Sequence, residues 1–265
     1  MNPLSRRDVL KLLASTSLAP ALLTLGCRQA TASPWDIAQA IRAAIKLPVI
    51  PKEDFVITDF GARGDGQQDC TDAIARTIAA ASAAGGGRVV VPGGVYMTGP
   101  VHLESHVELH VEKGATLSFI PEPDRYLPAV FTRWEGMEFM GLSPLIYAFD
   151  KTDIAITGEG TLDGGADDTH WWPWKGKWKG KFLDAEPTQK AARDRLFADA
   201  EAGVSPEDRH YAEGAYLRPP FVQMYRCQNV LIEGVTITNS PFWLLHPVLS
   251  TGVTVRGVTC RSMGP

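Results

Sequence analysis

The stretch Phe221–Arg261 nearly repeats itself, and this repeat limits what the chain can fold into more than any other feature. Asn229–Ile237 realigns 23 residues later on Gly252–Cys260, and each copy holds an alternating run, a glycine turn and a second alternating run. Alternation with a period of two is typical of a half-buried strand, because successive side chains point to opposite faces. A repeat of roughly 20–25 residues with very short strands fits one coil of a parallel β-solenoid. The sequence therefore predicts an all-β chain wound as a parallel β-helix.

Composition indicates one large domain and narrows the classes of function. The chain has 265 residues, of which 45% are hydrophobic, and a net charge of −4. A mildly acidic chain without a large basic patch is not expected to bind nucleic acid. Its four cysteines are too few and too scattered for a disulfide scaffold or a zinc site, and Cys227 and Cys260 either pair or remain free thiols. Neither a cofactor nor a metal ion is expected.

Residues 1–32 have the pattern of an export signal. Arg6 and Arg7 precede a short apolar stretch, Leu10–Leu25, which is typical of a twin-arginine leader that is removed after export. Two processing sites compete: Cys27 in a lipoprotein-like box, which would carry a lipid, and the signal-peptidase site Ala30–Ala32. An ordinary amphipathic helix is the alternative. We expect an exported protein, either periplasmic or held at the cell envelope by that lipid anchor.

Residues 33–54 are expected to be a tether ahead of the β-helix domain, residues 55–265. Isoleucines at intervals of four predict a short helix in the tether, namely Ile37, Ile41 and Ile45. After a predicted strand at Phe55–Phe60, Asp69 is a candidate N-cap for the alanine-rich helix Thr71–Ala84. This helix is expected to cap the first coil and to cover a sheet edge that would otherwise be open.

Further alternating runs predict more coils, at Arg88–Tyr96, Val107–Val111, Ala115–Phe119 and Ile154–Leu162. Between them, Pro121–Pro144 is expected to be irregular. An insertion at residues 169–214 departs from the repeat and contains a predicted helix, Pro187–Ala202. Such insertions often project from the binding face of a solenoid. Three histidines at intervals of four are expected to share one solvent side of strands and not to bind a metal: His102, His106 and His110.

The insertion is rich in tryptophan and lysine, which indicates a carbohydrate ligand. Tryptophan faces suit the C–H face of a pyranose, and lysines suit sugar carboxylates. The residues concerned are Trp171, Trp172, Trp174, Trp178, Lys175, Lys177, Lys179 and Lys181. In the alternative interpretation these tryptophans pack a small core inside the insertion. The adjacent Asp167 and Asp168 follow a turn and are expected to be solvated, without an acid–base role.

Short segments in one order between Phe55 and the C-terminus carry a family resemblance. They are Thr58–Gly66, Gly85–Pro92, Thr98–Pro100, Thr132–Gly136, Ser143–Tyr147, Gly160–Gly164, Trp171–Lys175, Arg218–Pro220, Asn239–Trp243 and His246–Pro247. Together they resemble glycoside hydrolase family 28, the polygalacturonases and their relatives. The resemblance implies a right-handed parallel β-helix. It also implies hydrolysis, with inversion, of α-linked galacturonic acid in pectin or its oligosaccharides.

The resemblance assigns no catalytic residue to this sequence. The family's aspartates lie in Asn-x-Asp-Gly-x-Asp and Gly-Asp-Asp segments, followed by Gly-His-Gly and Arg-Ile-Lys, and none of these occurs here. Gly264-Pro265 resembles the two residues that precede the first segment, so the sequence is expected to be an N-terminal fragment that is inactive alone. An inverting glycosidase needs an acid and a base roughly 6.5–9.5 Å apart.

Substrate-binding residues are expected on the coil that ends nearest to the missing segments. Trp243 and His246 would lie about 5 Å, along the axis of the solenoid, from the coil that would carry the missing segments. Alternatively, His246 is a turn residue beside Pro247. Arg133 and Trp134, in the matched segment Thr132–Gly136, are also expected at the substrate. The tryptophans of the insertion complete the expected set: Trp171, Trp172 and Trp174.

Two rival classes remain open at this point. A polysaccharide lyase of the same fold would need calcium-binding carboxylates and an arginine base, and no aspartate cluster here has calcium-ligand spacing. A non-catalytic β-helix that binds carbohydrate or serves a structural purpose is the other.

Overall fold

The structure, a computed structural model, describes residues 33–265. The expected export signal and the candidate lipidation site at Cys27 lie outside the described residues. The described residues divide into two compact units, one that ends at Ala44 and one that comprises residues 45–265. In the first unit, helix α2 (Pro34–Ala44) confirms the helix predicted from the isoleucine spacing, and all its side chains are at least partly exposed. Over residues 33–265, no helix is both long and apolar enough to cross a membrane.

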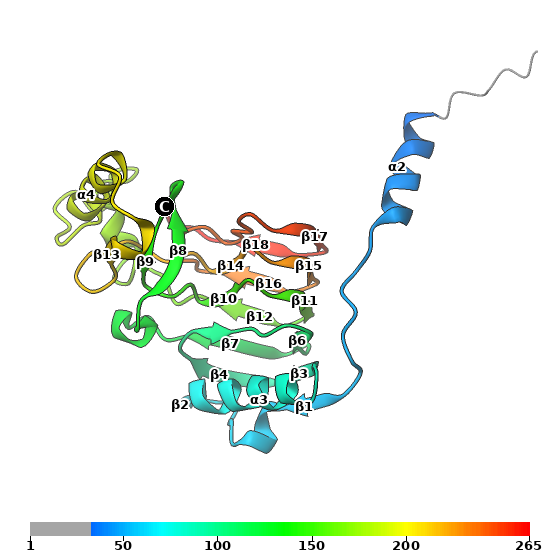
Figure 1. Cartoon of the computed structure of the whole chain (residues 1–265). Coiled ribbons are helices and arrows are strands. Elements are labelled where there is room, and N and C mark those ends of the chain that lie inside the picture. The colour runs from blue at the N-terminus through cyan, green and yellow to red at the C-terminus, as the bar shows by residue number, and fades with distance from the viewer. Residues whose placement is uncertain (1–32) are drawn as a thin grey trace, which may run out of the picture. The chain divides into compact units, whose positions relative to one another are not determined.

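The second unit is a parallel β-helix with three sheets, which confirms the predicted fold (Figure 1). Sheet A contains, in order, β1 (Asp54–Val56), β3 (Gly87–Val91), β6 (Val107–Val111), β11 (Thr152–Gly158), β15 (Gln228–Glu233) and β17 (Thr251–Arg256). Sheet B contains β18 (Thr259–Arg261), β16 (Thr236–Thr238), β12 (Thr161–Asp163), β7 (Ala115–Phe119), β4 (Gly94–Thr98) and β2 (Asp65–Asp69). Sheet C contains β14 (Val222–Tyr225), β10 (Ile146–Phe149) and β5 (Val101–His102).

The 23-residue repeat in the sequence matches the way the strands pair in the structure. Val230 pairs with Val253 and Ile232 with Val255 across β15 and β17. Ile237 pairs with Cys260 across β16 and β18. Within residues 33–265, Cys227 and Cys260 are free thiols and do not pair with each other.

The core lies inside the coils, where equivalent side chains stack from one coil to the next. In sheet A, Val89 pairs with Leu109, Leu109 with Ile156, and Ile156 with Ile232, and each is at most 1% exposed. Burying one such side chain contributes about 1.5–3 kcal/mol. The coils are therefore held together mainly by these apolar ladders.

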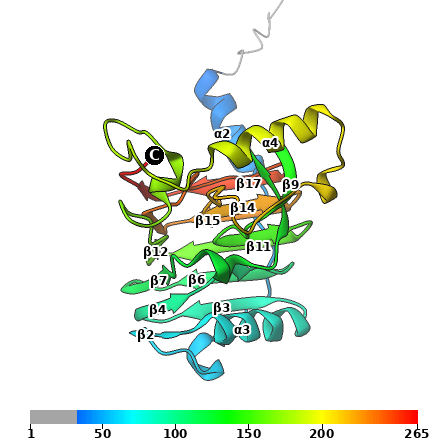
Figure 2. The same ribbon diagram turned by 90° about the vertical axis from the view of Figure 1, so that its left-hand side faces the viewer.

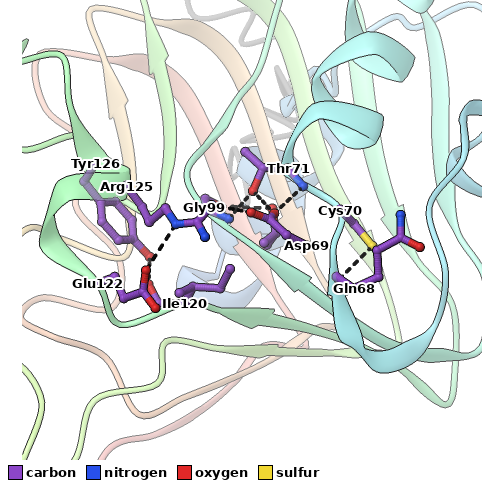
Figure 3. Close-up of polar contacts among 10 residues, drawn as sticks. Gln68, Asp69, Cys70, Thr71, Gly99, Ile120, Glu122, Arg125 and Tyr126 are labelled. Carbon is purple, nitrogen blue, oxygen red and sulfur yellow. Dashed lines mark hydrogen bonds and ion pairs between the residues drawn. The ribbon is translucent and has the colours of Figure 1, made fainter.

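Helix α3 (Thr71–Ala83) packs on the first coil as the predicted cap, with Ile74, Thr77 and Ile78 among its buried residues (Figure 1). Asp69 was predicted to be the N-cap of this helix, but Cys70 occupies that position. Asp69 therefore lies one residue before the N-cap, where it still contacts the start of the helix. Asp69 Oδ1 accepts the Thr71 N–H at 2.9 Å, and the Thr71 hydroxyl accepts the Gly99 N–H at 2.6 Å. Arg125 pairs with Asp69 Oδ2, which attaches the loop after β7 to the cap (Figure 3).

Two expectations about the strands were wrong. The strand predicted at Phe55–Phe60 ends at Val56 and continues as the 3₁₀ helix η1 (Ile57–Phe60). The three histidines do not share one side: His102 lies in sheet C, His110 in sheet A and His106 in the turn between.

The segment expected to be irregular, Pro121–Pro144, contains an antiparallel hairpin. After η2 (Pro123–Tyr126), strand β8 (Val130–Trp134) pairs with β9 (Met137–Gly141). The insertion adds η3 (Trp172–Lys175), α4 (Lys190–Glu201), η4 (Pro206–Asp208) and β13 (His210–Tyr211), and β13 extends the hairpin sheet beside β9 (Figure 1). Figure 2 shows α4 next to β9. The predicted helix Pro187–Ala202 is confirmed as α4, whose Leu196 shares a buried cluster with Trp134 and Tyr211.

Candidate functional site

The outward side of sheet C carries a column of polar and aromatic side chains. Tyr147 on β10 pairs with His102 on β5 and with Gln223 on β14. The next coil continues this sheet, since the His246 N–H donates to the Val222 carbonyl at 2.8 Å. His246 therefore lies beside Gln223, with 2.9 Å between His246 Nδ1 and Gln223 Nε2.

An aromatic row crosses the end of this column. Trp243 stacks on Phe242 with ring centroids 4.4 Å apart, and Phe242 stacks on Trp134 at 5.4 Å. Trp243 also meets His246 edge to face at 4.3 Å. Trp243 is 38% exposed, whereas Trp134 is 1% exposed. The row thus ends in one partly exposed indole, Trp243, which packs against two further rings.

The β8–β9 hairpin forms a wall against the outward side of sheet C. The Tyr147 hydroxyl donates to the Phe131 carbonyl at 2.5 Å, and the Thr132 hydroxyl donates to Gln223 Oε1 at 2.7 Å. The Tyr225 hydroxyl on β14 contacts the Glu138 carboxylate on β9. Beneath this wall Gln223 is fully buried.

His246 is neutral at pH 7 because its surroundings disfavour a positive charge. Burial lowers the pKa of His246 to about 4, and the positive charge of Arg133 adds to this effect. The site thus combines an exposed indole, a neutral imidazole and a guanidinium. Such a combination can stack on an apolar sugar face and donate hydrogen bonds to a carboxylate.

The structure brings Trp243, His246, Arg133 and Trp134 into one region, but it corrects the expected exposure of several tryptophans. Trp134, Trp171 and Trp172 are 1%, 2% and 7% exposed, so their ring faces are not open to a sugar. Trp171 packs edge to face on Tyr126 at 5.4 Å, and the Trp172 indole N–H donates to the Ser240 carbonyl at 2.9 Å. Both belong to the main core, so these two rings attach the insertion to the coils.

Trp174 is half-buried, between Trp171 and Tyr216. The lysines of the insertion are exposed, as expected for a surface that could meet an acidic ligand: Lys175, Lys177, Lys179 and Lys181. Two of them already have partners, since Lys181 pairs with Asp168 at 2.6 Å and Lys179 lies over the Trp178 ring.

Sequence reasoning missed Gln223, Thr132 and Phe242 as parts of the site. The repeat could have identified Gln223 as a neighbour of His246, because Gln223 precedes His246 by one 23-residue period. Thr132 and Phe242 lie in segments that carry the family resemblance, but the resemblance could not show their roles, which depend on the hairpin folding back over sheet C.

A groove of about 800 Å³ lies elsewhere, on the outward side of sheet A, where residues 47–54 cross it. Both of its arginines are already paired: Arg88 with Asp54 at 2.7 Å, and Arg256 with Glu233 at 2.6 Å. The Thr157 hydroxyl likewise contacts both His110 and Glu108. This groove presents no comparable set of open donors, so the sheet C face is the better candidate.

Several known proteins similar to this chain are polygalacturonases. Residues 55–110 match the family described as rhamnogalacturonase A/epimerase, pectate lyase-like. A probable polygalacturonase of Vitis vinifera is 26% identical over 212 residues, which cover 77% of this chain and 36% of that protein. The crystal structure of a hyperthermoactive exopolygalacturonase from Thermotoga maritima is 50% identical with a TM-score of 0.83, over 87% of this chain and 52% of that chain.

A family 28 exopolygalacturonase of Yersinia enterocolitica shares the fold, at 23% identity and a TM-score of 0.54 over 80% of this chain and 39% of that chain. The chain thus spans 36% to 52% of the length of these three relatives.

Proposed function

This chain is homologous to the polygalacturonases of glycoside hydrolase family 28, and from that premise we propose that the protein acts on pectin. The substrate is α-linked galacturonic acid in polygalacturonan or its oligosaccharides, and the reaction is hydrolysis with inversion. The observation that carries the proposal is the exposed Trp243 ring beside a neutral imidazole and the Arg133 charge. A ring face with adjacent donors and a cation matches a sugar that bears a carboxylate.

The acid and the base of the reaction are not assigned to residues of this chain. An inverting glycosidase places two carboxyl groups roughly 6.5–9.5 Å apart across the scissile bond. The polar side-chain partner of His246 within residues 33–265 is Gln223, which is not a carboxylate. The proposed contribution of these residues is therefore to bind and orient the substrate.

Trigalacturonate should bind to the purified chain through Trp243 and His246. We expect Trp243→Ala to weaken binding about fivefold to tenfold, because stacking on an aromatic ring contributes about 1–3 kcal/mol and a sugar ring belongs at the low end. Isothermal titration at pH 7 measures this affinity.

Trp178→Ala is the matched control, because Trp178 is half-buried but lies outside the site, and it should leave the affinity unchanged. Neutral galactotriose should bind at least tenfold more weakly than trigalacturonate if the Arg133 charge contributes. Equal affinity for both sugars, or an unchanged affinity in Trp243→Ala, would reject this site.

We further propose that the protein is exported through the twin-arginine route, on the basis of Arg6, Arg7 and the short apolar stretch that follows. Replacing both arginines by lysine should leave the precursor in the cytoplasm, as measured by cell fractionation and immunoblotting. Cys27→Ala separates the two processing sites, since only a lipid-anchored protein would leave the membrane fraction in this variant. Normal export of the double-lysine variant would contradict the proposal.

A further inference from the structure

Gln223 is a polar side chain in an unusual position. It lies on the outward side of β14, yet it is 0% exposed because the β8–β9 hairpin covers it. A buried amide must satisfy its carbonyl oxygen and both of its N–H groups within the protein. Gln223 has three partners for this purpose: the Thr132 hydroxyl at 2.7 Å, the Arg133 carbonyl at 3.2 Å and His246 Nδ1 at 2.9 Å.

The Arg133 carbonyl determines how the amide is oriented. A carbonyl oxygen can only accept a hydrogen bond, so the group that faces it must be the NH2 of Gln223. In the opposite orientation two carbonyl oxygens would face each other in a buried site, and both would lose their donors. The Thr132 hydroxyl can then donate to Oε1, which is consistent with the first assignment.

The same NH2 group faces His246 Nδ1 with its second hydrogen. Nδ1 must therefore accept a hydrogen bond, and a neutral imidazole whose Nδ1 accepts carries its hydrogen on Nε2. The ring nitrogen turned away from Gln223 is thus a donor. A donor at this position pairs with an acceptor oxygen of a ligand, and it cannot accept a proton from a sugar hydroxyl.

We propose that Gln223 is a positioning residue that holds His246 as the neutral Nε2–H tautomer, so that His246 donates a hydrogen bond to the carboxylate of a galacturonate stacked on Trp243. The part that concerns the sugar rests on the proposed function. The part that concerns the tautomer depends only on the contacts among Gln223, Arg133 and His246.

The tautomer can be measured in the free protein. In long-range ¹H–¹⁵N spectra of ¹⁵N-histidine-labelled protein at pH 7, wild-type His246 should show a protonated Nε2 and a bare Nδ1. In Gln223→Glu, a carboxylate replaces the donor, and His246 should become protonated on Nδ1. Assignment of the signal uses His246→Gln, in which it disappears. A wild-type ring protonated on Nδ1, or an unchanged tautomer in Gln223→Glu, would overturn the proposal.

Thr132→Val is the matched control for a merely structural role of Gln223. This substitution removes the contact to Gln223 Oε1 and leaves the contacts of the NH2 group intact. Thr132→Val should lower the melting temperature and keep the Nε2–H tautomer. If Gln223→Glu does not fold, Gln223→Met removes both N–H donors without adding a charge. In that variant His246 should populate both neutral tautomers, and a single Nε2–H form would count against the proposal.

Binding separates this proposal from the proposed function. Gln223→Glu and Gln223→Met should each bind trigalacturonate at least about tenfold more weakly than wild type, as expected when a hydrogen bond to a charged group is lost. Wild-type protein that shows the Nε2–H tautomer but no affinity for trigalacturonate would refute the proposed function and leave the tautomer assignment standing. Variants that change the tautomer but bind as tightly as wild type would overturn the assigned role of His246 as donor.

Discussion

Replacing Gly158 by alanine should destabilise the fold severely and sharply lower the yield of soluble protein. Gly158 ends β11 with a φ of +109°, and a Cβ built there would lie 2.0 Å from the Val111 carbonyl oxygen of the neighbouring coil. A side chain cannot occupy that space unless the two coils separate, and the positive φ adds a strain of its own. We expect a loss of more than about 4 kcal/mol in the free energy of unfolding, measured by soluble yield and urea denaturation.

Gly114→Ala is the control for the backbone conformation alone. Gly114 has a φ of +84°, but no atom lies within 4 Å of the position that its Cβ would take. This variant should lose only about 1–2 kcal/mol and remain soluble. Equal losses in the two variants would show that the close approach of the coils at Gly158 is not present in solution.

Replacing Trp171 by alanine should cost about 3–5 kcal/mol of stability, the range found for large aromatic residues in cores. The Trp171 ring is 2% exposed and packs edge to face on both Tyr126 and Trp174. Its removal leaves a cavity where the insertion meets the coils. Urea denaturation of the purified variant measures the loss.

Trp178 belongs to the same insertion but is not part of the main core. Trp178→Ala should therefore change the free energy of unfolding by less than about 1 kcal/mol. This pair of variants distinguishes the two roles considered for the insertion's tryptophans. If Trp171→Ala kept wild-type stability and lost affinity for trigalacturonate, Trp171 would be a ligand-binding residue after all.

The fold could be predicted from the sequence because local sequence features determine the strands and turns of each coil. The alternation around Val230 and Ile232 and the glycine turn after Glu233 are local features, and they recur one period later with the pairing seen in sheet A. The capping helix could also be predicted from local sequence, since its alanine-rich run begins beside Asp69 and ends at a glycine cluster.

The site could be predicted only in part, because exposure depends on partners far away in the sequence. Nothing near Trp172 in the chain shows that its indole will donate to the Ser240 carbonyl, 68 residues later. Likewise, Trp134 is buried by Phe242 and by residues of α4. Trp243 and His246 were predicted to lie on one coil, and the structure places them there in contact, whereas the hairpin beside them was predicted to be irregular.

The hairpin over sheet C also determines how this region can be recombined with that of a relative. The contact between Thr132 and Gln223 spans 91 residues, and the contact between Gln223 and His246 spans 23. A chimera with a crossover point between Trp134 and Phe221 would combine one parent's hairpin with the other parent's coils. The two halves then fit only if Thr132, Gln223 and His246 are matched, so the three positions have to be inherited or exchanged together.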